Sequence, residues 1–375
     1  MKNYFETYVS NTYAASGNQL YFNMDAEEVR VGRVFYKIAF SGEYNYSIMF
    51  SNVMDSTYAN GSVSYKNLVC EGWKIHGARI GKCKEIPSSK PITELTLADA
   101  DEIGEFDIKV SDFRDLQFWG KTEKEVLPKE FFYSDPVKME FDSGDYLCLE
   151  ITFSGKMIPY HEESQIPVFV KCGREWKYSK EMPFAGMIGC DRKVKARIGY
   201  FGDSITQGIG VAPNSYAHWN ALLSEKIGAE YSYWNLGIGY GRANDAASDG
   251  AWIYKAMQND IVFVCYGVND ILQNQAEDVI KSDLTHIVDS LKSAGKRVIL
   301  QTVPPFDYNG ENIAKWQRIN GYVKSVLAAR VDAIFDNGSI LGKEDALHLA
   351  KFGGHPNEEG CALWANALFE ELSTL

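Results

Sequence analysis

The pattern of apolar and polar positions divides the chain into two parts near residue 155. Up to that point apolar and polar side chains alternate, as in residues 44–51, 106–111 and 147–153. A period of two is typical of half-buried strands. Residues 142–145, Asp-Ser-Gly-Asp, separate two such runs and have the composition of a hairpin loop. Short strands with turns between them predict an all-β sandwich or jelly-roll domain over residues 1–155.

From residue 194 onward, continuous apolar runs alternate with segments of helical period. The clearest helix, 277–294, keeps its apolar residues on one face and ends at Gly295. The alternation predicts an α/β domain over residues 194–375, with a doubly wound parallel sheet of about five strands. The predicted strands are 197–201, 231–234, 261–266, 298–303 and 333–335. The predicted helices are 215–227, one through Trp252, 277–294, 312–329 and 356–372.

Residues 156–193 fit neither pattern, because prolines and glycines interrupt them. They contain too many apolar residues for a solvated tether. We therefore expect a connecting segment that lies over both domains.

Composition and charge exclude several classes of partner. The 375 residues carry a formal net charge of −12, which argues against nucleic acid or an anionic membrane surface as a partner. No apolar run reaches the roughly 20 residues of a membrane span. Seven cysteines lie far apart without a Cys-x-x-Cys spacing, which favours reduced thiols over a disulfide framework or a zinc site. We expect a cytoplasmic protein, although a secreted chain that had lost its leader would begin similarly.

Aromatic residues are dense in the β domain, and Trp73 and Trp119 stand out. They could stack on sugar rings in a binding groove, because a flat apolar face suits a pyranose. Aromatic residues also favour strands and fill sandwich cores, and this second interpretation is the one we favour.

The candidate chemistry lies in four short polar blocks, three of which directly follow predicted strands of the α/β domain. The carboxyl ends of parallel strands meet at one edge of a sheet, where ligands bind. We therefore expect the four blocks to lie close together. They are residues 202–205 (Gly-Asp-Ser-Ile), 235–241 (Asn-Leu-Gly-Ile-Gly-Tyr-Gly), 267–270 (Gly-Val-Asn-Asp) and 353–357 (Gly-Gly-His-Pro-Asn).

These residue types can perform acyl transfer. A serine nucleophile needs a base for its proton and donors for the developing oxyanion. Ser204 is the candidate nucleophile and His355 the candidate base, with Pro356 expected in the first turn of the last helix. The donors would be the backbone N–H of Ser204, a backbone N–H in the turn at Gly239 and Tyr240, and the side-chain amide of Asn269. We interpret Asp203 as structural, holding the turn.

In their order and composition the four blocks resemble those of the SGNH (GDSL-type) hydrolase family. The resemblance covers roughly residues 194–375 and implies a serine esterase or acyl hydrolase with a flavodoxin-like fold and no metal or cofactor. A β-sandwich before such a domain is similar to the architecture of carbohydrate esterase family two, whose members remove acetyl groups from sugars.

The chain departs from that family at two positions. The family's second block usually places glycine where we align Tyr240. The oxyanion donor at this position is a backbone N–H, which is present whatever the side chain. The family also tends to place Asp three residues before the histidine, where this chain has Phe352. The third member would then be Asp345, a backbone carbonyl, or no group at all, and we favour the carbonyl. His348 competes with His355 as the base, because Asp345 precedes it by three residues.

The expected function is hydrolysis of short acyl esters, acetyl above all, on a small-molecule or oligosaccharide substrate. Two alternatives stay open. One is a lysophospholipase or thioesterase, against which stands the lack of a long apolar stretch in the loops. The other is a catalytically silent carbohydrate-binding protein, which the missing Asp favours and the presence of Ser204, Asn269 and His355 disfavours.

Overall fold

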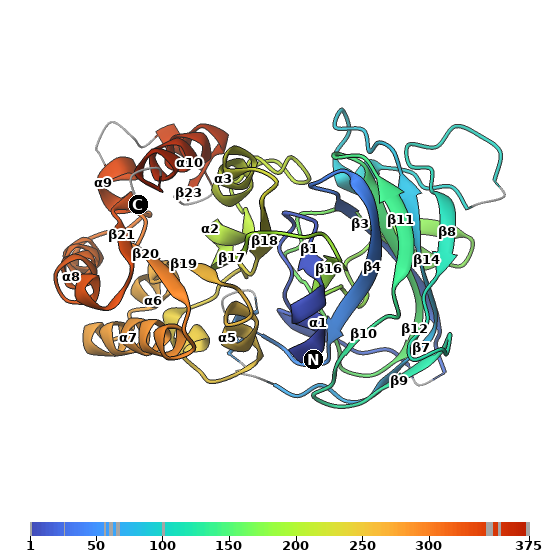
Figure 1. The fold of residues 1–375 in the computed structure, drawn as a ribbon, viewed down its shortest axis with the longest axis horizontal. Coiled ribbons are helices and arrows are strands. Elements are labelled where there is room, and N and C mark those ends of the chain that lie inside the picture. Colours follow the sequence, from blue (N-terminus) through green and yellow to red (C-terminus); the bar gives the residue numbers. More distant parts are fainter. Residues whose placement is uncertain are drawn as a thin grey trace. The chain divides into compact units, whose positions relative to one another are not determined.

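The structure is a computed structural model, and it describes residues 2–25, 27–55, 58–59, 63–64, 68–99, 102–342, 348–351 and 354–372. The chain forms two compact units (Figure 1). The first takes in Met1–Met54 and Leu68–Lys193, and the second Asp55–Asn67 and Val194–Leu375. This division differs from the predicted bounds, because a short segment from the first third of the chain belongs to the second unit.

The first unit consists mainly of two antiparallel sheets, so the predicted all-β region is confirmed. Trp73 on one sheet packs against Phe132 on the other, with ring centroids 6.1 Å apart. The five-stranded sheet contains β1 (Val9–Ser10), β16 (Met187–Cys190), β4 (Gly42–Ser51), β10 (Phe131–Tyr133) and β11 (Val137–Phe141). The seven-stranded sheet contains β15 (Glu175–Tyr178), β14 (Val168–Cys172), β3 (Arg30–Lys37), β12 (Tyr146–Gly155), β7 (Trp73–Cys83), β8 (Ser111–Asp115) and β9 (Lys124–Val126). Shorter elements are α1 (Lys2–Thr7), η1 (Ile92–Glu94), and the pair β2 (Leu20–Phe22) and β13 (Ile158–Tyr160).

Residues 156–193 are not the irregular connection that we expected. They supply β13, β14, β15 and β16, and β16 lies between β1 and β4 in the five-stranded sheet. The apolar residues of β14 and β16 are buried in succession rather than at every second position. Strands covered on both faces give continuous apolar runs, so the period of two that reveals half-buried strands is missing here.

The two tryptophans singled out in the β domain have different environments. Trp73 is 3% exposed, and its indole N–H donates to Asn52 Oδ1 at 3.0 Å, which agrees with a core residue. Trp119 is 58% exposed, so the core interpretation fails for this side chain.

The second unit is built on a parallel sheet with strand order β18, β17, β19, β20, β21. In chain order this is 2-1-3-4-5, the flavodoxin-like arrangement, so the predicted fold class is confirmed. Helices cover both faces, with α3 and α10 on one side and α5 and α7 on the other (Figure 1). On the first side, Trp219 of α3 stacks on Trp364 of α10 with centroids 4.8 Å apart. The strands are β17 (Ala196–Gly202), β18 (Tyr231–Asn235), β19 (Ile261–Cys265), β20 (Arg297–Gln301) and β21 (Ala333–Phe335).

The helices of this unit include the five predicted ones, of which the first begins four residues and the last two residues later than expected, and several short ones that were not predicted. They are α2 (Ser204–Gln207), α3 (Trp219–Ile227), α4 (Ala243–Ala246), α5 (Ala251–Ala256), α6 (Val268–Leu272), α7 (Glu277–Ser293), α8 (Glu311–Ser325), η2 (Leu327–Arg330), α9 (Asn337–Leu341) and α10 (Glu358–Leu372). The short pairs are β5 (Tyr58–Ala59) with β6 (Val63–Ser64), and β22 (Ala350–Lys351) with β23 (His355–Pro356). Within the described residues, no helix combines the length and apolarity that a membrane span requires.

A buried ion pair fastens the early segment to the second unit. Lys255 Nζ of α5 lies 2.6 Å from Asp55 Oδ2, and both side chains are 0% exposed. Removing one partner of such a pair leaves an uncompensated charge in the interior, which is far more costly than losing a surface pair.

We therefore expect Asp55→Asn to destabilise the second unit by about 3–5 kcal/mol, measured as a lower melting temperature of that unit. The double variant Asp55→Leu/Lys255→Met removes both charges and should regain most of the loss. Glu230→Gln is the matched control, because Glu230 pairs with Lys195 at the surface of the same unit, and it should not shift the melting temperature. Equal effects of Asp55→Asn and Glu230→Gln would contradict the prediction.

Candidate active site

Ser204 stands at the first position of a one-turn helix that directly follows β17. Asp203 caps this helix, since its Oδ1 accepts the N–H of Ile205 at 3.0 Å. The first N–H groups of a helix have no acceptor within the helix. The N–H of Ser204 therefore makes no hydrogen bond inside α2. A Cβ on Gly202 would lie 2.1 Å from Thr206 Oγ1 and 2.8 Å from the carbonyl oxygen of Cys265. Only glycine fits between the strand and this turn.

The structure brings Ser204 and His355 together. Ser204 Oγ and His355 Nε2 lie 2.9 Å apart, although 151 positions separate the residues in the chain. Both residues are partly exposed. This is the arrangement of a nucleophile and a base within hydrogen-bonding reach of each other.

His355 is held by strand pairing and not, as we expected, by the entrance to the last helix. Lys351 of β22 pairs with His355 of β23, and α10 begins only at Glu358. Pro356 therefore precedes the helix instead of lying in its first turn. Asn357 Oδ1 accepts the N–H of Gly360 at 2.9 Å and so organises the helix start.

Two contacts to His355 were not predicted from the sequence. The ring of Phe306 packs edge-on against the imidazole, with centroids 5.1 Å apart and planes at 79°. A Cβ on Gly210 would lie 2.9 Å from His355 Cβ, so the loop after α2 approaches the histidine closely. Phe306 could have been found, because it follows β20 and lies near the same carboxyl-end edge of the sheet as the other blocks.

His348, the competing base, lies at the surface. Its Nε2 is 3.8 Å from Glu359 Oε1, and 63% of its side chain is exposed. Its carbonyl oxygen accepts a hydrogen bond from Asn357 Nδ2 at 2.7 Å. Asp345, Phe352 and Gly353 lie outside the described residues, so the orienting partner of His355 stays a prediction.

The second block packs directly on the nucleophile turn. The N–H of Ile238 donates to the carbonyl of Gly202 at 3.1 Å, and a Cβ on Gly237 would lie 2.1 Å from the backbone nitrogen of Gln207. Tyr240 has φ 57°, whereas neither Gly239 nor Gly241 has a positive φ. The left-handed conformation favours glycine and costs other residues roughly 1–2 kcal/mol. Its occurrence at Tyr240 agrees with aligning this residue with the family's glycine.

Asn269 joins the second and third blocks. Its Nδ2 donates to the carbonyl of Gly241 at 2.9 Å, and a side-chain amide carries two N–H donors. One donor therefore fixes the amide against the second block, and the other can serve an oxyanion. Asp270 accepts the N–H of Ala243 at 2.8 Å and lies within 3.4 Å of the nitrogen of Asn244. Asp270 thus organises the start of α4.

Two buried carboxyl groups lie beneath the site. Burial raises the pKa of Asp203 to about 7, and the nearby Asp270 charge adds to the effect. Among the described residues, Asp203 Oδ2 has no hydrogen-bond partner. Burial likewise raises the pKa of Asp270 to about 6, against the opposing effect of the N–H groups of Ala243 and Asn244. Both carboxyl groups are therefore more easily protonated than usual.

Comparison with known proteins identifies the class of the second unit. Residues 200–363 match the model of the GDSL-like Lipase/Acylhydrolase family. This stretch is therefore a GDSL-like lipase/acylhydrolase domain, and the resemblance that the four blocks indicate is confirmed. No curated protein matches the chain.

Solved structures to which the chain is similar include three with the following identities, coverage and TM-scores. A member of the lipolytic protein G-D-S-L family from Veillonella parvula DSM 2008 is 22% identical, covering 48% of this chain and 99% of that one, with a TM-score of 0.41. The acetyl xylan esterase AlAXEase is 19% identical, covering 47% and 99%, with a TM-score of 0.39. The salicylyl-acyltransferase SsfX3 from a tetracycline biosynthetic pathway is 14% identical, covering 81% of each chain, with a TM-score of 0.41.

The raised pKa of Asp203 predicts how its replacement changes stability with pH. An acid whose pKa is higher in the folded than in the unfolded state binds more protons when folded, so stability falls as pH rises from about 4 to about 7. Asn is an equally good helix cap and does not ionise. Asp203→Asn should therefore match the wild type at pH 4 and exceed it at pH 8, by on the order of 2–4 kcal/mol.

Thermal unfolding of both proteins at pH 4, 6 and 8 measures this difference. A variant that is equally destabilised at all three values would show that the carboxyl group acts only through its hydrogen bond to Ile205.

Proposed function

We propose that the second unit hydrolyses short acyl esters, acetyl esters of carbohydrates in particular, by a serine mechanism. The observation that carries the proposal is the 2.9 Å separation between Ser204 Oγ and His355 Nε2. The presence of this pair, together with an Asn269 amide fixed by its hydrogen bond to the Gly241 carbonyl, disfavours a catalytically silent domain.

In the proposed reaction, Ser204 Oγ attacks the ester carbonyl while His355 Nε2 takes its proton. The N–H of Ser204, a backbone N–H at Gly239 or Tyr240, and the second N–H of Asn269 Nδ2 stabilise the oxyanion. The imidazolium then protonates the leaving alkoxide, and an acyl-serine ester remains. A water molecule, deprotonated by His355, hydrolyses this ester and restores Ser204.

Two contacts described above help to orient His355. Pairing with Lys351 fixes its backbone, and the ring of Phe306 restricts its imidazole. A group that accepts the Nδ1 proton would add tautomer control. We keep a backbone carbonyl as the proposed acceptor and Asp345 as the alternative.

The preference for a short acyl group is supported by the loops beside Ser204. Residues 206–218 and 237–250 contain glycine, alanine and polar residues without a run of large apolar side chains. Binding a long acyl chain requires a continuous apolar surface, since burial of each CH₂ contributes about 0.8 kcal/mol. Without such a surface, added chain length yields little binding energy.

Rates on paired esters test this substrate proposal. We expect kcat/KM to be at least about tenfold higher for an acetate than for the octanoate of the same alcohol, because an unburied chain contributes no binding energy. Peracetylated and selectively acetylated xylose oligomers should also release acetate. A preference for octanoate would contradict the proposal and favour a lysophospholipase or thioesterase.

Substitution of the two histidines tests the assignment of the base. His355→Ala and Ser204→Ala should each lower kcat by at least about 10⁴-fold, because nucleophile and base act as a unit. His348→Ala is the control and should retain wild-type turnover, because this side chain is at the surface. Loss of turnover in His348→Ala, with His355→Ala still active, would overturn the assignment. Circular dichroism of each variant checks that the fold persists.

A further inference from the structure

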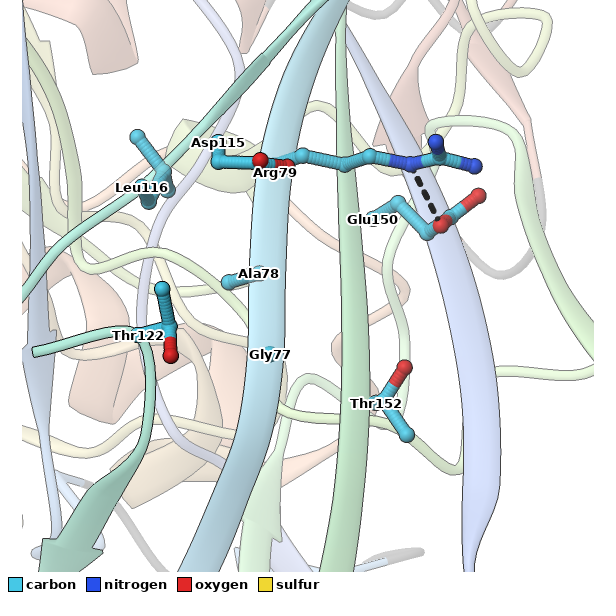
Figure 2. A pocket seen from close by; sticks show the side chains of 8 residues that line it. All are labelled: Gly77, Ala78, Arg79, Asp115, Leu116, Thr122, Glu150 and Thr152. Atoms are coloured by element: carbon cyan, nitrogen blue, oxygen red, sulfur yellow. Dashed lines mark hydrogen bonds and ion pairs between the residues drawn. The ribbon is translucent and has the colours of Figure 1, made fainter.

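A pocket of about 240 Å³ lies on one face of the seven-stranded sheet (Figure 2). Glu150 and Thr152 of β12 line it, and they alternate along the strand with Leu149 and Ile151, which are fully buried. Side chains at every second position of a strand share one face of the sheet. The pocket is therefore on the face opposite to Leu149 and Ile151, and all of its lining residues belong to the first unit.

The hollow forms at a glycine in the middle of β7. Gly77 pairs with Thr152 of β12, and the register of the two strands shifts next to this pair, between Thr152 and Phe153. On the other side of β7, β8 pairs with Arg79 and β9 with Ile75, so neither strand is paired with Gly77. A Cβ on Gly77 would meet nothing within 4 Å, which shows that the space above it is open.

The backbone conformation does not explain the glycine at this position. Gly77 has no positive φ, so residues with side chains can adopt its conformation. Glycine in a strand interior weakens the strand, and it often marks a place where a ligand approaches the backbone. Bulges are likewise frequent beside functional sites, where they redirect side chains. The open space is thus the feature that glycine provides here.

One wall of the pocket is fixed by charge pairing. Arg79 Nε donates to Glu150 Oε1 at 2.7 Å, and the guanidinium carbon lies 3.9 Å from the centroid of the Phe113 ring. Glu150 Oε2 accepts from Arg33 Nε at 2.7 Å. The Glu150 carboxylate is therefore compensated by two guanidinium groups, and the wall is ordered without a ligand.

Three polar side chains around Gly77 have hydrogen-bonding capacity to spare. The hydroxyls of Thr122 and Thr152 lie on opposite sides of β7, and Asp115 lies beside the stem of Arg79 (Figure 2). Within the part of the chain that the structure describes, none of these three side chains makes a hydrogen bond or an ion pair. Each hydroxyl can donate and accept, whereas a carboxylate only accepts.

The charges around the pocket favour a neutral ligand. The charge of Arg79 is offset by Glu150, so the uncompensated charge is that of Asp115, which repels anions. Among the described residues, no three acidic, histidine or cysteine side chains converge as a metal site would require. The volume lies below the roughly 300–1,000 Å³ of pockets for drug-sized ligands, so a single small ring fits better than a longer molecule.

We propose that this pocket binds one neutral sugar unit, either free or within a polysaccharide. Hydroxyls of the sugar donate to Asp115 and exchange hydrogen bonds with Thr122 and Thr152, and Ala78 and Leu116 contact its C–H groups. The class of ligand follows from the groups of the pocket itself. The proposal therefore goes beyond the ester hydrolysis proposed for the second unit and does not rest on it.

Binding to neutral and acidic polysaccharides tests the proposal. The full chain carries Ser204→Ala, which prevents turnover of any residual ester. Affinity electrophoresis measures its retardation by arabinoxylan and glucomannan, which are neutral, and by polygalacturonate, which is acidic. Calorimetric titration with xylose, glucose and mannose measures binding of a free sugar. We expect binding to at least one neutral probe and none to polygalacturonate. Binding of a polymer without binding of its free sugar would assign the pocket to polysaccharides.

Gly77→Val is the most direct variant, because it fills the hollow and leaves every polar group in place. Its Cβ has room and valine favours strands, so the melting temperature should not fall, whereas binding should be lost. Asp115→Asn removes the charged acceptor and should weaken binding by at least about tenfold. Thr152→Val removes one hydroxyl at nearly constant shape and should weaken it severalfold.

Thr93→Val is the matched control for Thr152→Val, because Thr93 is exposed in the same unit and does not line the pocket. Its binding should equal that of the parent. Failure of the parent to bind any neutral probe would overturn the proposal. So would undiminished binding by a folded Gly77→Val variant, a loss of affinity that Thr93→Val shares, or a preference for polygalacturonate.

Discussion

The arrangement of the candidate active site depends on backbone segments that approach one another more closely than a Cβ atom would permit. Gly202 touches Thr206 and Cys265, and Gly237 touches Gln207. Gly210 meets Pro356 and His355 in the same way. The first, second and last blocks are thus locked together through glycines, and Asn269 adds the third block through its bond to Gly241. Because protein interiors transmit strain instead of absorbing it, even a methyl group at these glycines would displace Ser204 and His355 from each other.

Much of the second unit could be predicted, because its signals are local. Continuous apolar runs revealed the parallel strands, and the polar blocks singled out Ser204 and His355, whose side chains the structure brings within hydrogen-bonding distance. The positions of β14 and β16 could not be predicted, since strands buried on both faces lose the alternating pattern. The pairing of His355 with Lys351 was also missed, because Pro356 in front of a helical pattern resembles a helix start. Nothing in the sequence near Trp119 distinguishes it from the buried Trp73. The exposure of each side chain depends on which strands and loops of the folded domain lie over it.

The carboxyl group of Asp203, next to Ser204, makes a hydrogen bond that the fold needs although it is buried away from water. Asp203 must accept the N–H of Ile205 to start α2, yet it is buried and its Oδ2 has no partner among the described residues. Its raised pKa keeps the group largely neutral below about pH 7. A neutral carboxyl places no negative charge beside Ser204, the next residue in the chain. The low solvation that raises the pKa of Asp203 thus also keeps this charge away from the candidate nucleophile.

The ion pair between Asp55 and Lys255 also limits when the second unit can be completed during synthesis. The two residues are 200 positions apart, and chains grow at about 5–20 residues per second. Asp55 therefore emerges roughly 10–40 s before its partner. During that interval the unit to which Asp55 belongs cannot be completed, because Lys255 has not yet been synthesised. The ion pair that holds Asp55 in the second unit can therefore form only after all residues of the first unit have been synthesised.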